Sequence, residues 1–252
     1  MKSFIAKLTL GAAAIALAGT ASAKVLPEPP EDPGAVHSYI LLDRTGSMSD
    51  IWDEALGSVN AYAASVGEAD EGEVDGEDIE TDVTLAVFDY QDGMQFDVLR
   101  KGVKAEDWND VTNDEANPRG MTPLFDAIGR MVSLAEADKP EKAVIVIMTD
   151  GRENSSRELT KDGAKAALAR AEAKGWEVVF LGAEFASFDD AESVGMDARK
   201  TMAVGQGSMQ DSMSALAKKS RAYGKGEEAE IEFNEEDRAL ADEEGVKERQ
   251  NK

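Results

Sequence analysis

The chain has 252 residues, a formal net charge of −24, no cysteine and a single histidine, His37. The acidic balance makes nucleic acid and anionic membrane surfaces poor partners and favours cations or basic proteins. The absence of cysteine excludes thiol catalysis and cysteine-ligated metals. One histidine argues against Ser-His-Asp catalysis and against sites with several histidine ligands.

Residues 1–23 have the pattern of a signal peptide. Lys2 and Lys7 precede an apolar stretch, which ends in the small residues Ala21-Ser22-Ala23. The stretch is short for a spanning helix, which disfavours a retained membrane anchor. We therefore expect export to the periplasm or the medium, without membrane insertion after cleavage. The mature chain would have 252 − 23 = 229 residues and, without the two lysines, a net charge of −24 − 2 = −26. A proline-rich leader, 24–36, would precede the folded domain.

The apolar patterns predict alternating strands and helices over a single domain, 37–224. Strands are predicted at 38–43, 81–90, 94–103, 142–150, 176–184 and 201–205. Helices are predicted at 49–66, 121–137, 157–175, 187–196 and 208–225. The turn QDG at 91–93 indicates a hairpin, and hence one antiparallel edge strand. The uniformly apolar central strands predict a three-layer α/β/α sandwich around a mostly parallel sheet.

Two segments are strongly acidic, one within this pattern and one after it. Residues 68–82 hold nine acids and no base, and predict a solvated loop. An EF-hand reading of this loop is weak, because Glu71 stands in the first ligand position and a strand follows instead of a helix. Residues 225–252 are polar, with 11 acids and 4 bases after Gly226, and predict a disordered tail.

Oxygen-bearing side chains follow the first predicted strand. Asp43, Thr45 and Ser47 alternate in a loop that Gly46 allows to fold tightly. Asp150 ends another predicted strand, and ligands of such sheets bind at the carboxyl ends of strands. Thr122 adds a third hydroxyl at the start of a predicted helix. Two carboxylates and three hydroxyls form a ligand set that suits a hard divalent cation such as Mg²⁺.

These fragments resemble the von Willebrand factor A domain. The resemblance rests on Asp43-x-Thr45-x-Ser47, then Gly120–Leu124, then Thr149-Asp150-Gly151, with separations of 122 − 43 = 79 and 150 − 122 = 28 residues. It covers about residues 37–222. It implies the Rossmann-like fold of that family and a metal-ion-dependent adhesion site.

The resemblance also implies roles for the site residues. Ser47 and Thr45 would bind the metal directly, and Thr122 directly or through water. Asp43 and Asp150 would accept hydrogen bonds from metal-bound groups or ligate the metal. Mg²⁺ is expected, with Mn²⁺ or Ca²⁺ possible, and an Asp or Glu carboxylate of a protein partner would complete the shell. The implied function is metal-dependent adhesion without catalysis. Thr45 stands where the family usually has Ser, and its hydroxyl coordinates equally well.

Four further residues are candidates for partner contact at the rim of the site. They are Arg44, Met48, Arg152 and Glu153. An alternative function is a Mg²⁺-dependent phosphatase of the haloacid-dehalogenase type, in which a nucleophilic Asp ends the first strand. That chemistry needs a second carboxylic acid two residues later, where this chain has Thr45. Each fragment taken alone also fits a plain turn or helix cap.

Overall fold

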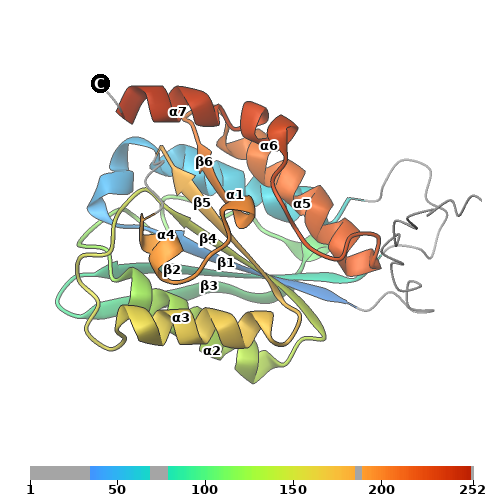
Figure 1. The fold of residues 1–252 in the computed structure, drawn as a ribbon, viewed down its shortest axis with the longest axis horizontal. Helices are drawn as coiled ribbons and strands as arrows, with labels where there is room; N and C mark the ends of the chain where they lie inside the picture. Colours follow the sequence, from blue (N-terminus) through green and yellow to red (C-terminus); the bar gives the residue numbers. More distant parts are fainter. Residues whose placement is uncertain (1–34, 69–78, 185–188, 251–252) are drawn as a thin grey trace, which may run out of the picture.

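The computed structural model describes residues 35–68, 79–184 and 189–250. Its centre is a six-stranded sheet in the order β3-β2-β1-β4-β5-β6 (Figure 1). The strands are β1 (Val36–Asp43), β2 (Thr81–Tyr90), β3 (Met94–Lys104), β4 (Lys142–Thr149), β5 (Glu177–Ala183) and β6 (Thr201–Val204). All neighbouring pairs are parallel except β2 and β3, which form the antiparallel edge. The predicted α/β sandwich is confirmed.

Helices cover both faces of the sheet, α1 and α5 on one side and α2 and α3 on the other (Figure 1). The α-helices are α1 (Trp52–Val66), α2 (Leu124–Asp138), α3 (Lys161–Glu172), α4 (Asp189–Ser193), α5 (Met209–Lys225), α6 (Glu235–Leu240) and α7 (Glu243–Gln250). Short 3-10 turns lie at Gly46–Asp50, Ala105–Asp107 and Ala198–Lys200. Side chains alternate along a strand, so Ile40 and Leu42 of β1 pack under α1 and α5. Tyr39 and Leu41 pack in the opposite core cluster.

Helix α2 begins at Leu124, three residues later than predicted. Two acidic side chains satisfy backbone groups around its first turn. Glu153 accepts a hydrogen bond from the Phe125 amide (2.9 Å), and buried Asp126 accepts from the amides of 157–159. The residues just before Leu124 are not helical. Met121 instead pairs with Tyr90, at the end of β2, as an isolated β-bridge.

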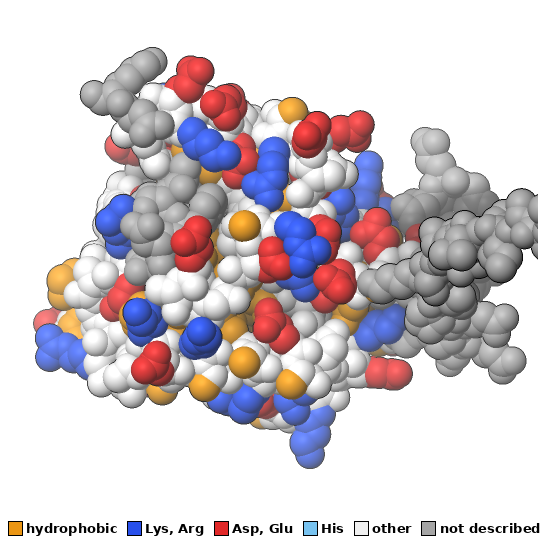
Figure 2. Space-filling view, viewed as in Figure 1, with side chains coloured by type: hydrophobic (Ala, Val, Ile, Leu, Met, Phe, Trp, Pro, Cys, Tyr) orange, Lys and Arg blue, Asp and Glu red, His pale blue; other side chains and the backbone are white. Residues whose placement is uncertain are grey.

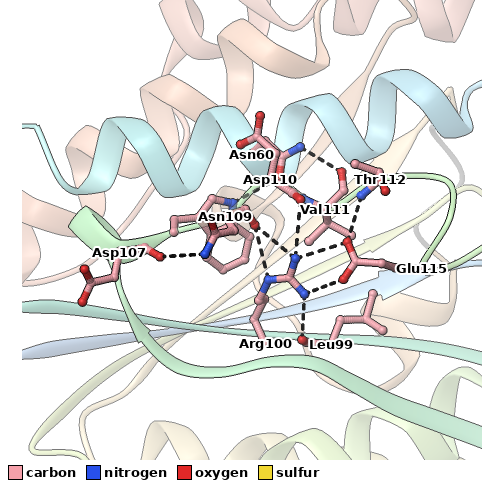
Figure 3. A network of polar contacts seen from close by, with 10 residues as sticks. Asn60, Leu99, Arg100, Asp107, Asn109, Asp110, Val111, Thr112 and Glu115 are labelled. Carbon is pink, nitrogen blue, oxygen red and sulfur yellow. Dashed lines mark hydrogen bonds and ion pairs between the residues drawn. The ribbon is translucent and has the colours of Figure 1, made fainter.

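The irregular segment between β3 and α2 is tied to the body of the domain (Figure 3). Arg100 of β3 forms an ion pair with Glu115 (Nη1–Oε1 2.7 Å) and donates to the carbonyl of Asn109. The side-chain amide of Asn60, on α1, contacts the Val111 backbone twice. Its Oδ1 accepts from the Val111 N–H (2.9 Å), and its Nδ2 donates to the Val111 carbonyl (3.1 Å). These contacts fix the chain that leads into the loop before α2.

The structure differs from the disordered tail expected over 225–252. Helices α6 and α7 lie along β6, and Ile231 and Val246 of this segment are fully buried. The buried carboxylate of Glu243 accepts from the β6 amide of Ala203 (3.1 Å) and pairs with Arg238 (2.9 Å). Composition alone misses this order because it does not show that buried Glu243 pairs with Arg238 and Lys247, or that the few apolar residues are placed to pack.

Several predicted features lie outside the described residues. These are the signal peptide 1–23, nearly all of the leader 24–36 and most of the acidic loop 68–82. Within the described ranges, no helix has the length and hydrophobicity required to cross a membrane.

The C-terminal segment should contribute to stability. Ile231→Ala removes a fully buried side chain and should lower the free energy of unfolding by about 2–5 kcal/mol. Leu240→Ala, at a side chain that is 41% exposed, serves as the matched control and should cost far less. Urea denaturation measures both. Equal, small effects would contradict the packed arrangement of this segment.

His37 is half-buried on β1. Its ring stacks on Tyr39 with 4.1 Å between centroids, and its Nε2 lies 2.8 Å from Thr84 Oγ1. Burial lowers the pKa of His37 below its ordinary value of 6.5, against the opposing effect of the Asp82 and Asp138 carboxylates. The folded state therefore disfavours the charged ring.

This shift predicts a pH-dependent stability. The stabilising contribution of neutral His37 is complete above pH 6.5 and is lost as the pH falls through the lower folded-state pKa. The wild type should lose stability relative to His37→Gln as the pH falls below about 6.5, and the difference should be constant at higher pH. Denaturant unfolding at each pH measures this difference. Parallel pH profiles for the two proteins would rule out the shift.

Candidate metal centre

The site lies where β1 and β4 end side by side. The two strands are parallel neighbours in the middle of the sheet. From β1 the chain proceeds to β2 on one side, and β4 lies on the other side. A crevice forms at such a switch point beyond the carboxyl ends of the strands, which is where ligands of open α/β sheets bind. Asp43 is the last residue of β1, and Asp150 directly follows β4.

The carboxylate of Asp43 is fully buried at the centre of the site. Its Oδ1 accepts a hydrogen bond from the Thr45 amide (2.7 Å), and its Oδ2 accepts from Thr149 Oγ1 (2.5 Å). Burial raises the pKa of Asp43 to about 7, although both of these hydrogen bonds act to lower it. Thr149 is a site residue to which the sequence interpretation gave no role. The feature of the sequence that could have identified Thr149 is a hydroxyl residue at the end of an otherwise apolar strand.

Hydroxyl groups connect the three loops around this carboxylate. Thr45 Oγ1 lies 3.2 Å from Ser47 Oγ, and Thr122 Oγ1 donates to Thr45 Oγ1 (3.3 Å). Ser47 Oγ donates to Asp150 Oδ1 (2.6 Å). Burial also raises the pKa of Asp150. The structure thus brings together all five residues predicted for the metal site.

The donor set and the space around it fit a divalent cation. A Cβ at Gly151 would lie 3.1 Å from Thr122 Oγ1, 3.6 Å from Ser47 Oγ and 3.8 Å from Asp43 Oδ2. Because glycine has no side chain, the space between these three oxygens stays open for an ion. Ser47 is exposed and Asp150 partly exposed, which opens the site to solvent. Across the described parts of the chain, no three or more Asp, Glu and His side chains group as a metal site. A cation here would therefore depend on the hydroxyl oxygens.

Backbone contacts hold the loops in register. The Gly46 amide donates to the carbonyl of Gly120 (3.3 Å), which joins the loop after β1 to the loop before α2. Gly120 has a φ of +70°, and a Cβ there would lie 2.5 Å from the Tyr90 carbonyl oxygen, so a larger residue would displace the loop. Asn154 joins the loop before α2 to its own loop, which follows β4. Its side-chain Oδ1 accepts from the Thr122 backbone N–H (2.9 Å), and its backbone N–H donates to the Thr122 carbonyl (3.0 Å).

Two residues predicted for partner contact are buried, so their predicted role is corrected. Arg44 is only 4% exposed, and its guanidinium pairs with Asp89 (2.6 Å) and Asp97 (2.5 Å). Met48 is fully buried in the core beside α1. Arg44 turns inward because fully buried Asp89 needs a positive partner, and Met48 turns inward because an apolar side chain gains free energy by burial.

The other two rim candidates differ from each other. Arg152 is exposed next to the site. Glu153 is partly buried and accepts hydrogen bonds from the amides of Phe125, Ser155 and Ser156. Its carboxylate therefore supports the start of α2. Of the four predicted rim residues, Arg152 retains a position suited to partner contact.

Comparisons with known proteins identify the fold. No family model matches the sequence, and no curated protein matches it. Among solved structures, the von Willebrand factor domain of the type V pili tip protein Mfa5 from Porphyromonas gingivalis superposes with a TM-score of 0.52 at 10% identity, over 73% of this chain and 94% of that one.

Two further structures agree. Manganese-loaded TRAP protein from Plasmodium vivax matches with a TM-score of 0.54 at 15% identity, over 75% of this chain and 74% of that one. The pilus adhesin SpaC from Lactobacillus rhamnosus GG matches with a TM-score of 0.52 at 14% identity, over 75% of this chain and 30% of that one. The chain therefore has the fold of a von Willebrand factor A domain.

Proposed function

We propose that this protein is a binding module that holds a divalent cation at the ends of β1 and β4 and engages a protein partner through it. The observation that carries the proposal is the convergence of two carboxylates and three hydroxyls from three loops on one solvent-open point. These side chains are Asp43, Thr45, Ser47, Thr122 and Asp150. The adhesive role is supported by the neighbours, which include a pilus tip protein and a pilus adhesin.

The residues divide the work by their chemistry. Ser47, Thr45 and Thr122 present neutral oxygens that would hold the cation, while Asp43 and Asp150 supply negative charge and accept hydrogen bonds. Mg²⁺ is the expected ion because it takes about six oxygen ligands at about 2.0–2.1 Å. Mn²⁺ and Ca²⁺ are alternatives, and the TRAP structure is described as manganese-loaded. A bound cation supplies a positive centre that offsets the carboxylates and accepts an Asp or Glu oxygen of the partner.

Two features support binding in place of catalysis. The phosphatase alternative needs a carboxylic acid two residues after Asp43, and that position holds Thr45, whose hydroxyl contacts Ser47 and Thr122. In addition, His37, the single histidine of the chain, lies near the start of β1, at the opposite end of that strand from Asp43. We therefore propose a non-catalytic module. The predicted signal peptide and the exported nature of pilus proteins favour a location in the periplasm or outside the cell.

Metal binding is tested by titrating the protein with Mg²⁺ and Mn²⁺ in a calorimeter. Asp43→Asn removes the central negative charge and should weaken binding by at least about tenfold. Asp162→Asn, at an exposed position on α3, is the matched control and should bind as the wild type does. Equal affinities for all three proteins, or no binding by the wild type, would refute the metal centre.

Partner binding is tested by capture from the secreted and periplasmic fractions of the source organism. The wild type in Mg²⁺ should retain a partner that is absent with EDTA and absent with Asp43→Ala, because both conditions remove the cation. Mass spectrometry identifies and quantifies what is retained. A partner recovered equally in all three conditions would contradict metal-dependent adhesion.

A further inference from the structure

The two edges of the central sheet differ in how they are covered. At one edge, α6 and α7 pack on β6, and the buried carboxylate of Glu243 accepts a hydrogen bond from the Ala203 amide of that strand (3.1 Å). Figure 2 shows acidic and basic side chains interspersed over these helices, at the top of the view. The other edge is β3, and no further strand of the described residues pairs with its outer side (Figure 1). Such an edge offers backbone N–H and C=O groups to another strand.

Only the second half of β3 carries features that discourage pairing. Lys101 and Lys104 have side chains about half exposed, Gly102 has a φ of +53°, and the register with β2 shifts between residues 98 and 103. Charged side chains and an irregular backbone protect an edge strand from further pairing. The first half, Met94–Val98, pairs residue for residue with β2 and contains no lysine, proline or bulge. The open part of the edge is therefore Met94–Val98.

The side chains of this segment divide between the two faces of the sheet. On the face of α2 and α3, Met94 and Phe96 are half-buried against the core cluster, and Val98 is 39% exposed. Phe96 also lines a groove of about 580 Å³ between β3 and α2. Gln95 and Asp97 lie on the opposite face, the face of α1. The segment thus presents one apolar row and one polar row.

This pattern is self-complementary in the antiparallel direction. When two copies pair about Phe96, the two Phe96 side chains stand opposite each other, and Met94 stands opposite Val98 on the same apolar face. On the polar face, Gln95 stands opposite Asp97. A centre at Asp97 would instead place two carboxylates opposite each other, which is unfavourable, and a centre at Gln95 would draw the hairpin turn into the pairing. Phe96 is therefore the centre at which the two rows match.

We propose that Met94–Val98 is a self-association surface, through which two copies of this chain join β3 to β3 in one continuous antiparallel sheet. The twofold axis passes through the centre of the pair, so that both copies use the same residues. The other strands are then reversed between the copies, and the two candidate metal centres lie at opposite ends of the dimer. The interface contains none of the candidate metal ligands, so the inference does not rest on the cation.

The charges next to the segment are compatible with this pairing. Asp97 is already paired with Arg44 (2.5 Å). Antiparallel pairing places the hairpin turn of one copy, with exposed Asp92, near the end of the other β3 that carries Lys101. The Lys101 side chain is 56% exposed, although it also pairs with Asp138 (3.0 Å). The local charges of the two copies therefore complement each other.

The charge of the whole chain opposes association at long range. Each copy carries a formal net charge of −24, and like charges repel. Salt screens this repulsion, because the Debye length falls from about 30 Å at 0.01 M to about 3 Å at 1 M. The proposed pairing also uses one short segment and is a small interface, so we expect association that depends on protein concentration and strengthens with salt.

The first test measures the dimer dissociation constant of the full chain by analytical ultracentrifugation, at low and at high NaCl. The wild type should dimerise more tightly at high NaCl. Gln95→Glu places a carboxylate opposite Asp97 twice in each dimer and should weaken association by about threefold or more, whereas Gln95→Lys should strengthen it. Gln206→Glu and Gln206→Lys, at an exposed position outside β3, change the net charge equally and are the matched controls.

The second test uses the absence of cysteine from the chain. The cysteine of Phe96→Cys would face its own copy across the pair, with about 4.5–5.5 Å between Cβ atoms, which is near the separation in a disulfide. The cysteine of Val98→Cys, on the same face of the strand, would lie about 13 Å from its copy. Mild oxidation should therefore link Phe96→Cys into a covalent dimer and leave Val98→Cys monomeric on non-reducing gels.

The outcomes decide the proposal. A wild type that stays monomeric at every concentration and salt overturns self-association and leaves a strand of another protein as the candidate occupant of the edge. Equal crosslinking of the two cysteine variants, or crosslinking of Val98→Cys alone, overturns the pairing about Phe96. Circular dichroism shows whether Phe96→Cys is folded. If it is not, equal effects of Gln95→Glu and Gln95→Lys overturn the proposal, and opposite effects beyond those of the Gln206 controls support it.

Discussion

The buried carboxylate of Asp43 is the group on which the site depends. Removing a carboxylate from water costs several kcal/mol unless other groups compensate. Here the compensation comes from the Thr45 amide and the Thr149 hydroxyl, and burial still raises the pKa of Asp43 to about 7. The loops after β1 and β4 are arranged around this charge, and Thr122 enters from the loop before α2. A divalent cation is the natural counterpart of such an arrangement.

A second buried charge holds the loops in place. Asp89 at the end of β2 is fully buried and pairs with Arg44, whose backbone carbonyl accepts from the Arg119 amide (2.8 Å). Arg44 also reaches Asp97 on β3. Arg44 thus connects the loop after β1 to strands β2 and β3 through its guanidinium, and to the loop before α2 through its backbone carbonyl. Buried ion pairs contribute little net stability on average, so their value here lies in fixing a geometry.

The fold and the grouping of the five candidate side chains could be predicted from the sequence because their signals are local. Apolar runs mark the central strands, and Asp43, Thr122 and Asp150 stand at element boundaries whose order is enough to place them together. The burial of the Arg44 side chain could not be predicted, because its partner Asp89 lies 45 residues away and no local pattern links the two. Ordering of the C-terminal segment was missed for a related reason: Glu243 is satisfied by Arg238 nearby but also by the distant amide of Ala203.

The central claim is that the loops of Asp43, Thr122 and Asp150 form a metal centre. The most direct measurement is anomalous X-ray scattering from crystals of the protein soaked in Mn²⁺. The account predicts one strong anomalous peak within coordination distance of the Ser47, Thr45 or Thr122 hydroxyls, at roughly 2.0–2.4 Å, and no such peak in crystals of Asp43→Asn. A peak that lies elsewhere, or a site that stays empty at saturating Mn²⁺, would contradict it.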